Sequence, residues 1–149
     1  MSGMSAGAVR QFRRVPQVGV VVVGHGNFAA QMVETLITVV GDLDGVEGIA
    51  CRLDAPRSAI DEALREVIAR VDRGGGVIIL TDMLGDTASN ASVEFARERD
   101  DVEVVCGVNM PMLMKLVTAR SGTTAAELAA FIRRYGQEHI RWPTGDAAR

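Results

Sequence analysis

His25 follows an apolar, β-branched run and has a glycine on either side. Such a run predicts a strand buried on both faces, and open α/β sheets bind ligands beyond the carboxyl ends of their strands. An unperturbed imidazole has a pKa of about 6.5, so it can act near neutral pH as nucleophile, general base or metal ligand. A loop histidine that merely caps the next helix fits the same spacing, and both interpretations stay open.

A carboxylate follows another apolar run. Asp82 comes two residues after residues 77–80, which predict a buried strand. A carboxylate there can hold one imidazole nitrogen, fix the tautomer and leave the other nitrogen free to react. An aspartate that only shapes a turn or caps a helix is the alternative.

Further polar side chains stand at the start of a predicted helix. Thr87, Ser89 and Asn90 can offer hydroxyls and backbone amides to an anion, because helix N-termini are natural phosphate sites. Simple helix capping is the alternative, and for each residue taken singly it is the favoured interpretation. Asn109 and Pro111 fit a turn better than a chemical role.

The sequence lacks the residue patterns of three common kinds of functional site: metal centres, serine hydrolase sites and lysine-bearing phosphate loops. One histidine and one aspartate, with no nearby second histidine or paired cysteines, fall short of a usual metal-ligand set, so we expect neither metal nor cofactor. No GxSxG elbow follows a strand, which disfavours a serine hydrolase. The only lysine, Lys115, lies outside any glycine-rich loop, which excludes a lysine-bearing phosphate loop.

Length and composition indicate one globular domain. The chain has 149 residues, of which 48% are hydrophobic and 23% charged. We expect a flexible N-terminal tail over residues 1–17, a single domain over residues 18–142 and a C-terminal tail over residues 143–149. The formal charge of -3 argues against nucleic acid as a partner.

The predicted cellular location rests on the lengths of the apolar segments and on the cysteines. None is long enough to span a bilayer, and the first residues lack the apolar core of a secretory signal. Cys51 and Cys106 fall in predicted strands without a metal or disulfide spacing, which favours reduced, buried thiols. We therefore expect a cytoplasmic protein without direct membrane insertion.

The elements that must position these side chains alternate between strand and helix. Apolar periodicity predicts a helix after each strand. Gly41 is expected to end the first of these helices, and the glycines at 74–76 the second. Such alternation predicts a doubly wound α/β fold with a mainly parallel sheet and helices on both faces. The loops near His25, Asp82 and Asn109 then share one edge of the sheet. The predicted strands cover residues 18–23, 47–53, 77–80 and 102–106, and the last predicted helix starts at Thr123 or Thr124.

Three segments together carry a family resemblance over residues 18 to about 120. They are Val20-Val21-Val22-Val23-Gly24-His25-Gly26, Leu80-Thr81-Asp82-Met83-Leu84-Gly85-Asp86-Thr87-Ala88-Ser89-Asn90-Ala91 and Gly107-Val108-Asn109-Met110-Pro111-Met112-Leu113. With these segments the chain resembles the mannose-class IIA component of the bacterial sugar phosphotransferase system. The resemblance implies that the phosphocarrier HPr phosphorylates His25, that His25 passes the group to a IIB domain or a regulatory target, and that Asp82 orients the imidazole. It also implies a phosphoryl-binding role for Gly26, Met83, Asp86 and Thr87.

Two positions depart from that family pattern. Asp86 stands where the family usually has the second glycine of its loop, and a carboxylate pointing inward opposes an incoming dianion. Gly24 replaces a residue that is often threonine, so one hydroxyl donor is missing. Whether Asp86 impairs phosphorylation is the question that these departures raise.

The resemblance also implies a homodimer in which a C-terminal strand is exchanged. Residues 138–142, with Ile140 and Trp142 facing one way, are the expected antiparallel strand, and exchange of an edge element is a low-cost route to a symmetric dimer.

The expected activity is that of a phosphotransferase with a covalent phosphohistidine intermediate. Two alternatives remain: a regulatory binding module of the same fold with weak or no phosphotransfer, and the phosphotransfer subunit of a dihydroxyacetone kinase. The sequence does not indicate which sugar, if any, is transported.

Overall fold

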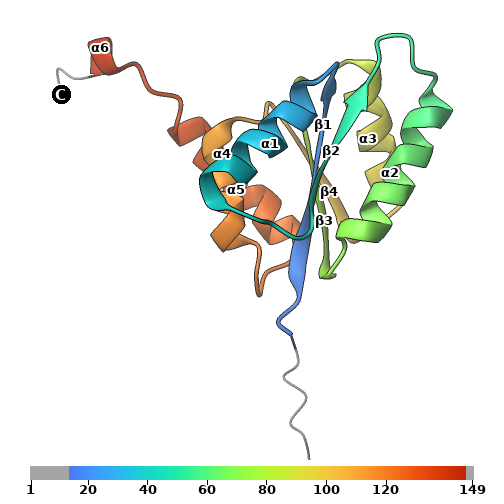
Figure 1. Cartoon of the computed structure of the whole chain (residues 1–149), viewed down its shortest axis with the longest axis horizontal. Helices are drawn as coiled ribbons and strands as arrows, with labels where there is room; N and C mark the ends of the chain where they lie inside the picture. The colour runs from blue at the N-terminus through green and yellow to red at the C-terminus, as the bar shows by residue number, and fades with distance from the viewer. Residues whose placement is uncertain (1–13, 147–149) are drawn as a thin grey trace, which may run out of the picture.

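The computed structural model describes residues 14–146, so most of the predicted N-terminal tail and the last three residues of the predicted C-terminal tail lie outside the described residues. Strands and helices alternate along the chain up to the fourth helix, as the sequence predicts (Figure 1). The elements are β1 Gln17–His25, α1 Phe28–Val40, β2 Val46–Cys51, α2 Arg57–Val71, β3 Gly74–Thr81, α3 Thr87–Arg97, β4 Val102–Cys106, α4 Met110–Ala119, α5 Ala125–Glu138 and α6 Pro143–Asp146.

The four described strands form one parallel sheet in the order β2-β1-β3-β4. Helices α1, α4 and α5 cover one face, and α2 and α3 cover the other (Figure 1). Side chains of β1 alternate between the two layers, with Val20 and Val22 in one and Val21 and Val23 in the other. The predicted doubly wound α/β fold is confirmed, and two-sided burial explains the unbroken β-branched run of β1.

Strands β1 and β3 lie side by side, but the helices that follow them leave on opposite faces. Helix α1 packs with one apolar layer and α3 with the other (Figure 1). Such a reversal opens a crevice at the carboxyl ends of the two strands, which is where open α/β sheets bind ligands. His25 ends β1, and Asp82 directly follows β3.

The glycine triplet has a different role from the predicted one. Helix α2 already ends at Val71, and Gly74, Gly75 and Gly76 begin β3 instead of ending the helix. A Cβ added to Gly75 would lie 2.6 Å from the carbonyl carbon of Gln17. The absence of a side chain therefore lets β3 approach β1 closely.

The C-terminal segment is helical at the start of the predicted strand. Glu138 is the last residue of α5, residues 139–142 form neither helix nor strand, and α6 follows within the predicted C-terminal tail. Ile140 and Trp142 are 75% and 68% exposed. Since a single chain offers this segment no second copy, its exchange in a dimer stays a prediction.

Gly75→Ala is expected to lower the free energy of unfolding by about 1–3 kcal/mol, because the new methyl group overlaps the Gln17 backbone. At an unhindered position the same change stabilises by about 0.4–1 kcal/mol through the unfolded state. The sign of the effect, measured by urea denaturation, therefore tests the close approach, and a raised midpoint would contradict it.

Candidate active site

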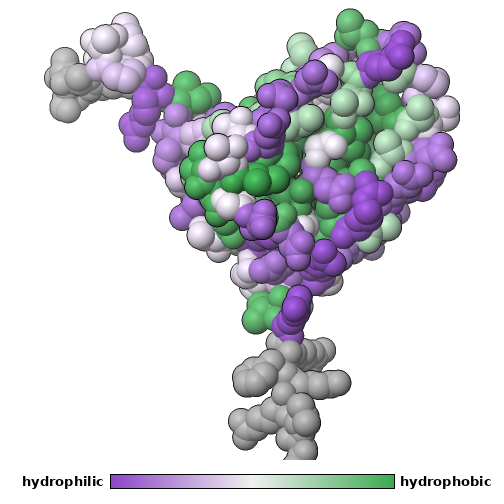
Figure 2. Space-filling view, viewed as in Figure 1, coloured by the Kyte–Doolittle hydropathy of each residue, from purple (hydrophilic) through white to green (hydrophobic). Residues whose placement is uncertain are grey.

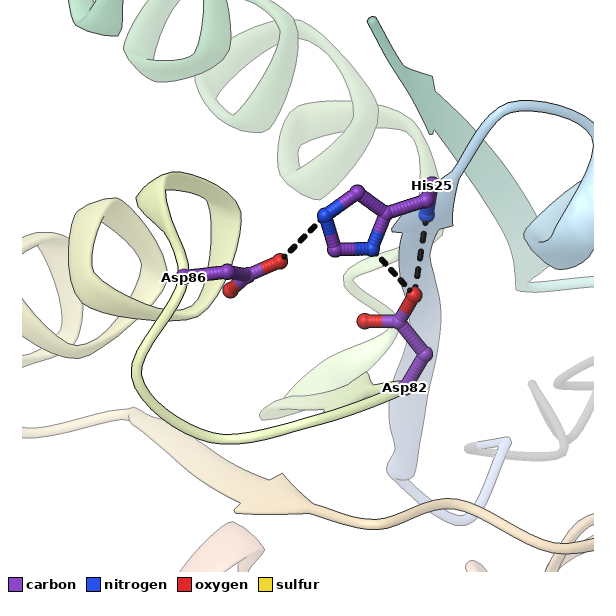
Figure 3. Close-up of side chains that lie close together, drawn as sticks. All are labelled: His25, Asp82 and Asp86. Atoms are coloured by element: carbon purple, nitrogen blue, oxygen red, sulfur yellow. Dashed lines mark hydrogen bonds and ion pairs between the residues drawn. The ribbon is translucent and has the colours of Figure 1, made fainter. Parts of the chain in front are cut away.

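Asp82 holds His25 at two points. Its Oδ2 atom accepts a hydrogen bond from the His25 backbone N–H at 3.0 Å and lies 2.7 Å from Nδ1 of the ring (Figure 3). Its other oxygen, Oδ1, accepts the Met83 backbone N–H at 2.8 Å. A carboxylate can only accept, so Nδ1 carries a proton and Nε2 takes no part in this hydrogen bond.

The electrostatics of this pair favour both charged forms. The hydrogen bond to Asp82 raises the pKa of His25 above its ordinary value; partial burial opposes this shift, and the charges of Asp82 and Asp86 add to it. Burial pushes the pKa of Asp82 upward, but hydrogen bonds from His25 and Met83 outweigh burial and leave that pKa lowered. Asp82 is therefore an ionised orienting group at neutral pH.

Asp86 faces the other edge of the imidazole. Its Oδ2 atom lies 3.0 Å from Nε2, and its side chain is 14% exposed (Figure 3). Oδ2 is buried and, among the described residues, has no partner with hydrogen-bond geometry, so its closeness to Nε2 is an electrostatic contact. The inward orientation considered for Asp86 from the sequence is the one that the structure adopts.

The position of Asp86 is set by the start of α3. Asp86 is the N-cap residue: its Oδ1 accepts the Ser89 backbone N–H at 2.7 Å. In return, Ser89 Oγ accepts the backbone N–H groups of Asp86 and Gly85, at 3.1 and 2.9 Å. One carboxylate oxygen thus caps the helix while the other faces the imidazole.

His25, Asp82 and Asp86 each have a potential metal-ligand atom within 4.8 Å of the others. The two carboxylates nevertheless lie at opposite ring nitrogens, Asp82 at Nδ1 and Asp86 at Nε2 (Figure 3). An ion bound to one nitrogen therefore lies on the far side of the ring from one of the carboxylates, and the three groups do not converge as a ligand set. The absence of a metal stays a prediction.

The other residues predicted to bind the phosphoryl group surround His25 on two sides. Asp86 and Thr87 line a cavity of about 280 Å³ with His25. Gly26 and Met83 line a second, larger and more open cavity of about 580 Å³ next to His25. The structure thus brings all four to the imidazole, while their binding roles remain untested.

Two other polar candidates serve the helices. Ser89 is fully buried in the capping box of α3. Asn109 accepts the Met112 backbone N–H at 3.1 Å and donates to the Gly136 carbonyl, also at 3.1 Å. Ser89 thus takes the capping role that the sequence left open, and Asn109 caps α4 and ties it to α5, a structural role of the kind that the sequence favoured for it.

The end of β2 and the loop that follows it supply site residues that sequence reasoning missed. Cys51, Arg52 and Leu53 line both cavities beside His25. Cys51 pairs in register with His25, and burial, with the charges of Asp86 and Asp82, raises the pKa of its thiol. The signal was available, because the end of the second predicted strand lies at the same sheet edge as His25.

The two cysteines differ in burial, and Gly24 is closely packed. Cys51 is buried as predicted, Cys106 is only partly buried, and both are free thiols. A Cβ on Gly24 would lie 2.6 Å from Cδ1 of Phe28, so the Phe28 ring fills the space that a larger residue would need.

Comparison with known proteins identifies the family. The model of the EIIA-man family, described as "PTS system fructose IIA component", matches residues 19–133. The chain belongs to this family. The family is that of the mannose-class IIA components, as the motifs around His25, Asp82 and Asn109 indicated.

Individual relatives agree with this assignment. The chain is 27% identical over 125 residues to the "PTS system mannose-specific EIIAB component" of Escherichia coli strain K12, covering 83% of this chain and 39% of that protein. It is 21% identical over 124 residues to the "PTS system fructose-specific EIIA component" of Bacillus subtilis, covering 83% of this chain and 85% of that protein. The chain therefore spans about two fifths of the length of the E. coli relative.

Solved structures of similar proteins share the fold. The phosphotransferase system component EIIA of Streptococcus agalactiae superposes with a TM-score of 0.77 at 25% identity, covering 86% of this chain and 98% of that one. The IIA protein associated with a fucose utilization operon of Streptococcus pneumoniae has the same TM-score at 23% identity, covering 90% of this chain and 98% of that one.

Over residues 14–146, no helix is long and apolar enough to cross a bilayer.

Asp82→Asn is expected to lower the pKa of His25 toward the ordinary histidine value, because it replaces the charged partner of Nδ1. Asp86→Asn is expected to lower the pKa of His25 by less, since Asp86 acts on the ring through charge alone. NMR titration of the His25 imidazole signals in the wild type and in each variant measures both shifts. A larger effect of Asp86→Asn would contradict this ranking.

Proposed function

We propose that the chain is a phosphohistidine carrier of a sugar phosphotransferase system. His25 accepts a phosphoryl group on Nε2 from HPr and passes it to a IIB domain. The observation that carries this proposal is the pairing of Nδ1 with Asp82 at 2.7 Å, which leaves Nε2 for the transfer in a side chain that lines a cavity at the sheet edge. The family assignment supports the same role.

Transfer starts from the neutral imidazole, with Nδ1–H donating to Asp82. The Nε2 lone pair attacks phosphorus, and the new Nε2–P bond forms as the P–N bond of the donor phosphohistidine breaks. The donor ring, protonated at its second nitrogen, leaves as neutral imidazole, so no proton has to move in this step. Because the free imidazole must be unprotonated at Nε2, transfer becomes faster as the pH rises through the raised pKa of His25.

Asp82 acts as a positioning and stabilising group in this scheme. When phosphorus bonds to Nε2, the ring keeps its proton on Nδ1 and becomes positively charged. The carboxylate at Nδ1 then stabilises the phosphorylated ring, as an orienting aspartate stabilises imidazolium elsewhere. Onward transfer to the acceptor reverses the same bond changes.

The start of α3 is the expected cradle for the phosphoryl oxygens. Thr87 lines the cavity beside His25 at the first position of this helix, where backbone N–H groups and the helix dipole favour an anion. Gly26 and Met83 are the proposed contacts on the other side of the ring.

We further propose a cytoplasmic homodimer. Figure 2 shows apolar side chains gathered over α1 on the face in view, where Ile37 and Val39 are 37% and 62% exposed. Exposed Ile140 and Trp142 add apolar surface near the C-terminus. Pairing of two chains would cover such surface, which monomeric proteins seldom leave open in large patches.

A regulatory binding module is the second candidate function, and Asp86 favours it. Its carboxylate lies 3.0 Å from Nε2, where a phosphoryl group would sit, so the site already holds an anion. A chain of this kind retains the fold and His25 but transfers phosphoryl groups slowly or not at all.

Incubation with phosphoenolpyruvate, enzyme I and HPr is expected to add one phosphoryl group to the wild-type chain, as measured by intact mass. His25→Ala is expected to abolish the label without unfolding the domain, because His25 is partly exposed at a strand end. Asp82→Asn is expected to slow labelling roughly 10- to 100-fold through loss of orientation and charge. An unlabelled wild-type chain, beside a labelled homologue, would overturn the carrier proposal.

Asp86→Asn is expected to speed phosphorylation by HPr about 10-fold, because it removes a negative charge next to Nε2 while asparagine still caps α3. Asp101→Asn makes the same change in net charge in the turn before β4 and should leave the rate unchanged. A slower Asp86→Asn chain would show instead that Asp86 assists transfer. Labelling of Asp86→Asn but not of the wild type would favour the regulatory module.

A further inference from the structure

The candidate site has an excess of negative charge. Asp82 and Asp86 flank the two ring nitrogens of His25, at 2.7 and 3.0 Å. A phosphoryl dianion bound to Nε2 would add two further negative charges beside Asp86. Phosphoryl transfer depends mainly on cations and donors that stabilise charge on the transferred oxygens, so this site needs a positive group that the family motifs do not supply.

Arg52 is the basic side chain placed to act there. It directly follows Cys51, the register partner of His25, and it lines both cavities beside the imidazole. In the part of the chain that the structure describes, no other arginine or lysine lines either cavity. Arg52 therefore shares the wall of the smaller cavity with Asp86 and Thr87.

The present partner of Arg52 holds it weakly. Its Nε and Nη2 atoms donate to the two carboxylate oxygens of Asp54, each at 3.0 Å. The two side chains are 81% and 72% exposed, and exposed ion pairs of this kind contribute little net stability. The guanidinium can therefore exchange Asp54 for another anion, and its planar fork matches phosphoryl oxygens.

We propose that Arg52 is a catalytic residue of the phosphoryl transfer: it leaves Asp54 and binds the phosphoryl oxygens at Nε2, where it also offsets Asp86. This inference rests on the proposed carrier function. Arg52 gives up no proton; the bonds that change remain the forming Nε2–P bond and the breaking P–N bond of the donor. Its contribution is charge stabilisation in the transition state and in the phosphorylated product.

The test compares rates of phosphorylation by phosphorylated HPr. Arg52→Ala is expected to slow labelling of His25 at least about 10-fold, and Arg52→Lys is expected to recover part of the loss, because lysine keeps the charge but not the fork. Arg99→Ala is the matched control. Arg99 makes the same kind of two-point pair with Asp101, at 3.0 and 3.1 Å, before β4 at the opposite end of the sheet.

Two additional variants separate a local charge role from a structural one. In an Asp86→Asn background, Arg52→Ala is expected to cost less than in the wild type, about threefold, because one of the charges that Arg52 offsets is gone. Asp54→Ala, which frees the guanidinium, is expected to keep or raise the rate.

The outcomes distinguish the inference from the function on which it rests. A labelled wild type with an unchanged Arg52→Ala rate overturns the role of Arg52 and leaves the carrier function standing, as does equal slowing by Arg99→Ala. An unlabelled wild type overturns both. Unchanged circular dichroism and unfolding midpoints of the variants exclude loss of fold as the cause of slowing.

Discussion

The parallel pairing of β1 with β3 is the constraint on which the site depends. Val23 lies opposite Thr81 in the register, and the Asp82 backbone N–H continues the ladder by donating to the Val23 carbonyl at 3.2 Å. This contact brings Asp82 beside His25, although 57 residues separate them in the chain. A shift of one residue in this register would turn the strand side chains to the opposite faces of the sheet and separate the pair.

Electrostatics then gives the two aspartates different roles at one imidazole. Asp82 is hydrogen-bonded on both oxygens, which fixes its position and its charge. Asp86 has one oxygen in the helix cap and the other near Nε2 without hydrogen-bond geometry. The first carboxylate orients the ring, whereas the second competes for the nitrogen that reacts. In the proposed transfer, the balance between these two carboxylates and Arg52 would set how readily the site accepts an anion.

The sequence predicts the parts of this site that depend on regular structure. Strand patterns locate His25 and Asp82 at one edge, because the ends of parallel strands share a side of the sheet. The inward orientation of Asp86 depends on the α3 cap, and no pattern of residue types specifies it. The sequence does not indicate Arg52, because a single arginine after a strand carries no motif. It predicts the wrong role for the glycines at 74–76, because local stop signals do not reveal a close approach between strands.

The shared carboxylate of Asp86 links the imidazole to backbone order. Oδ1 and Oδ2 belong to one rigid group, so movement of Oδ2 away from Nε2 also strains the bond from the Ser89 amide to Oδ1. An N-cap is worth about 0.5–2 kcal/mol, enough to change how often the first turn of a helix frays. A group bound at Nε2 that displaced Oδ2 would therefore change amide hydrogen exchange in the first turn of α3, and a partner touching this turn would sense the chemical state of His25 without touching the ring.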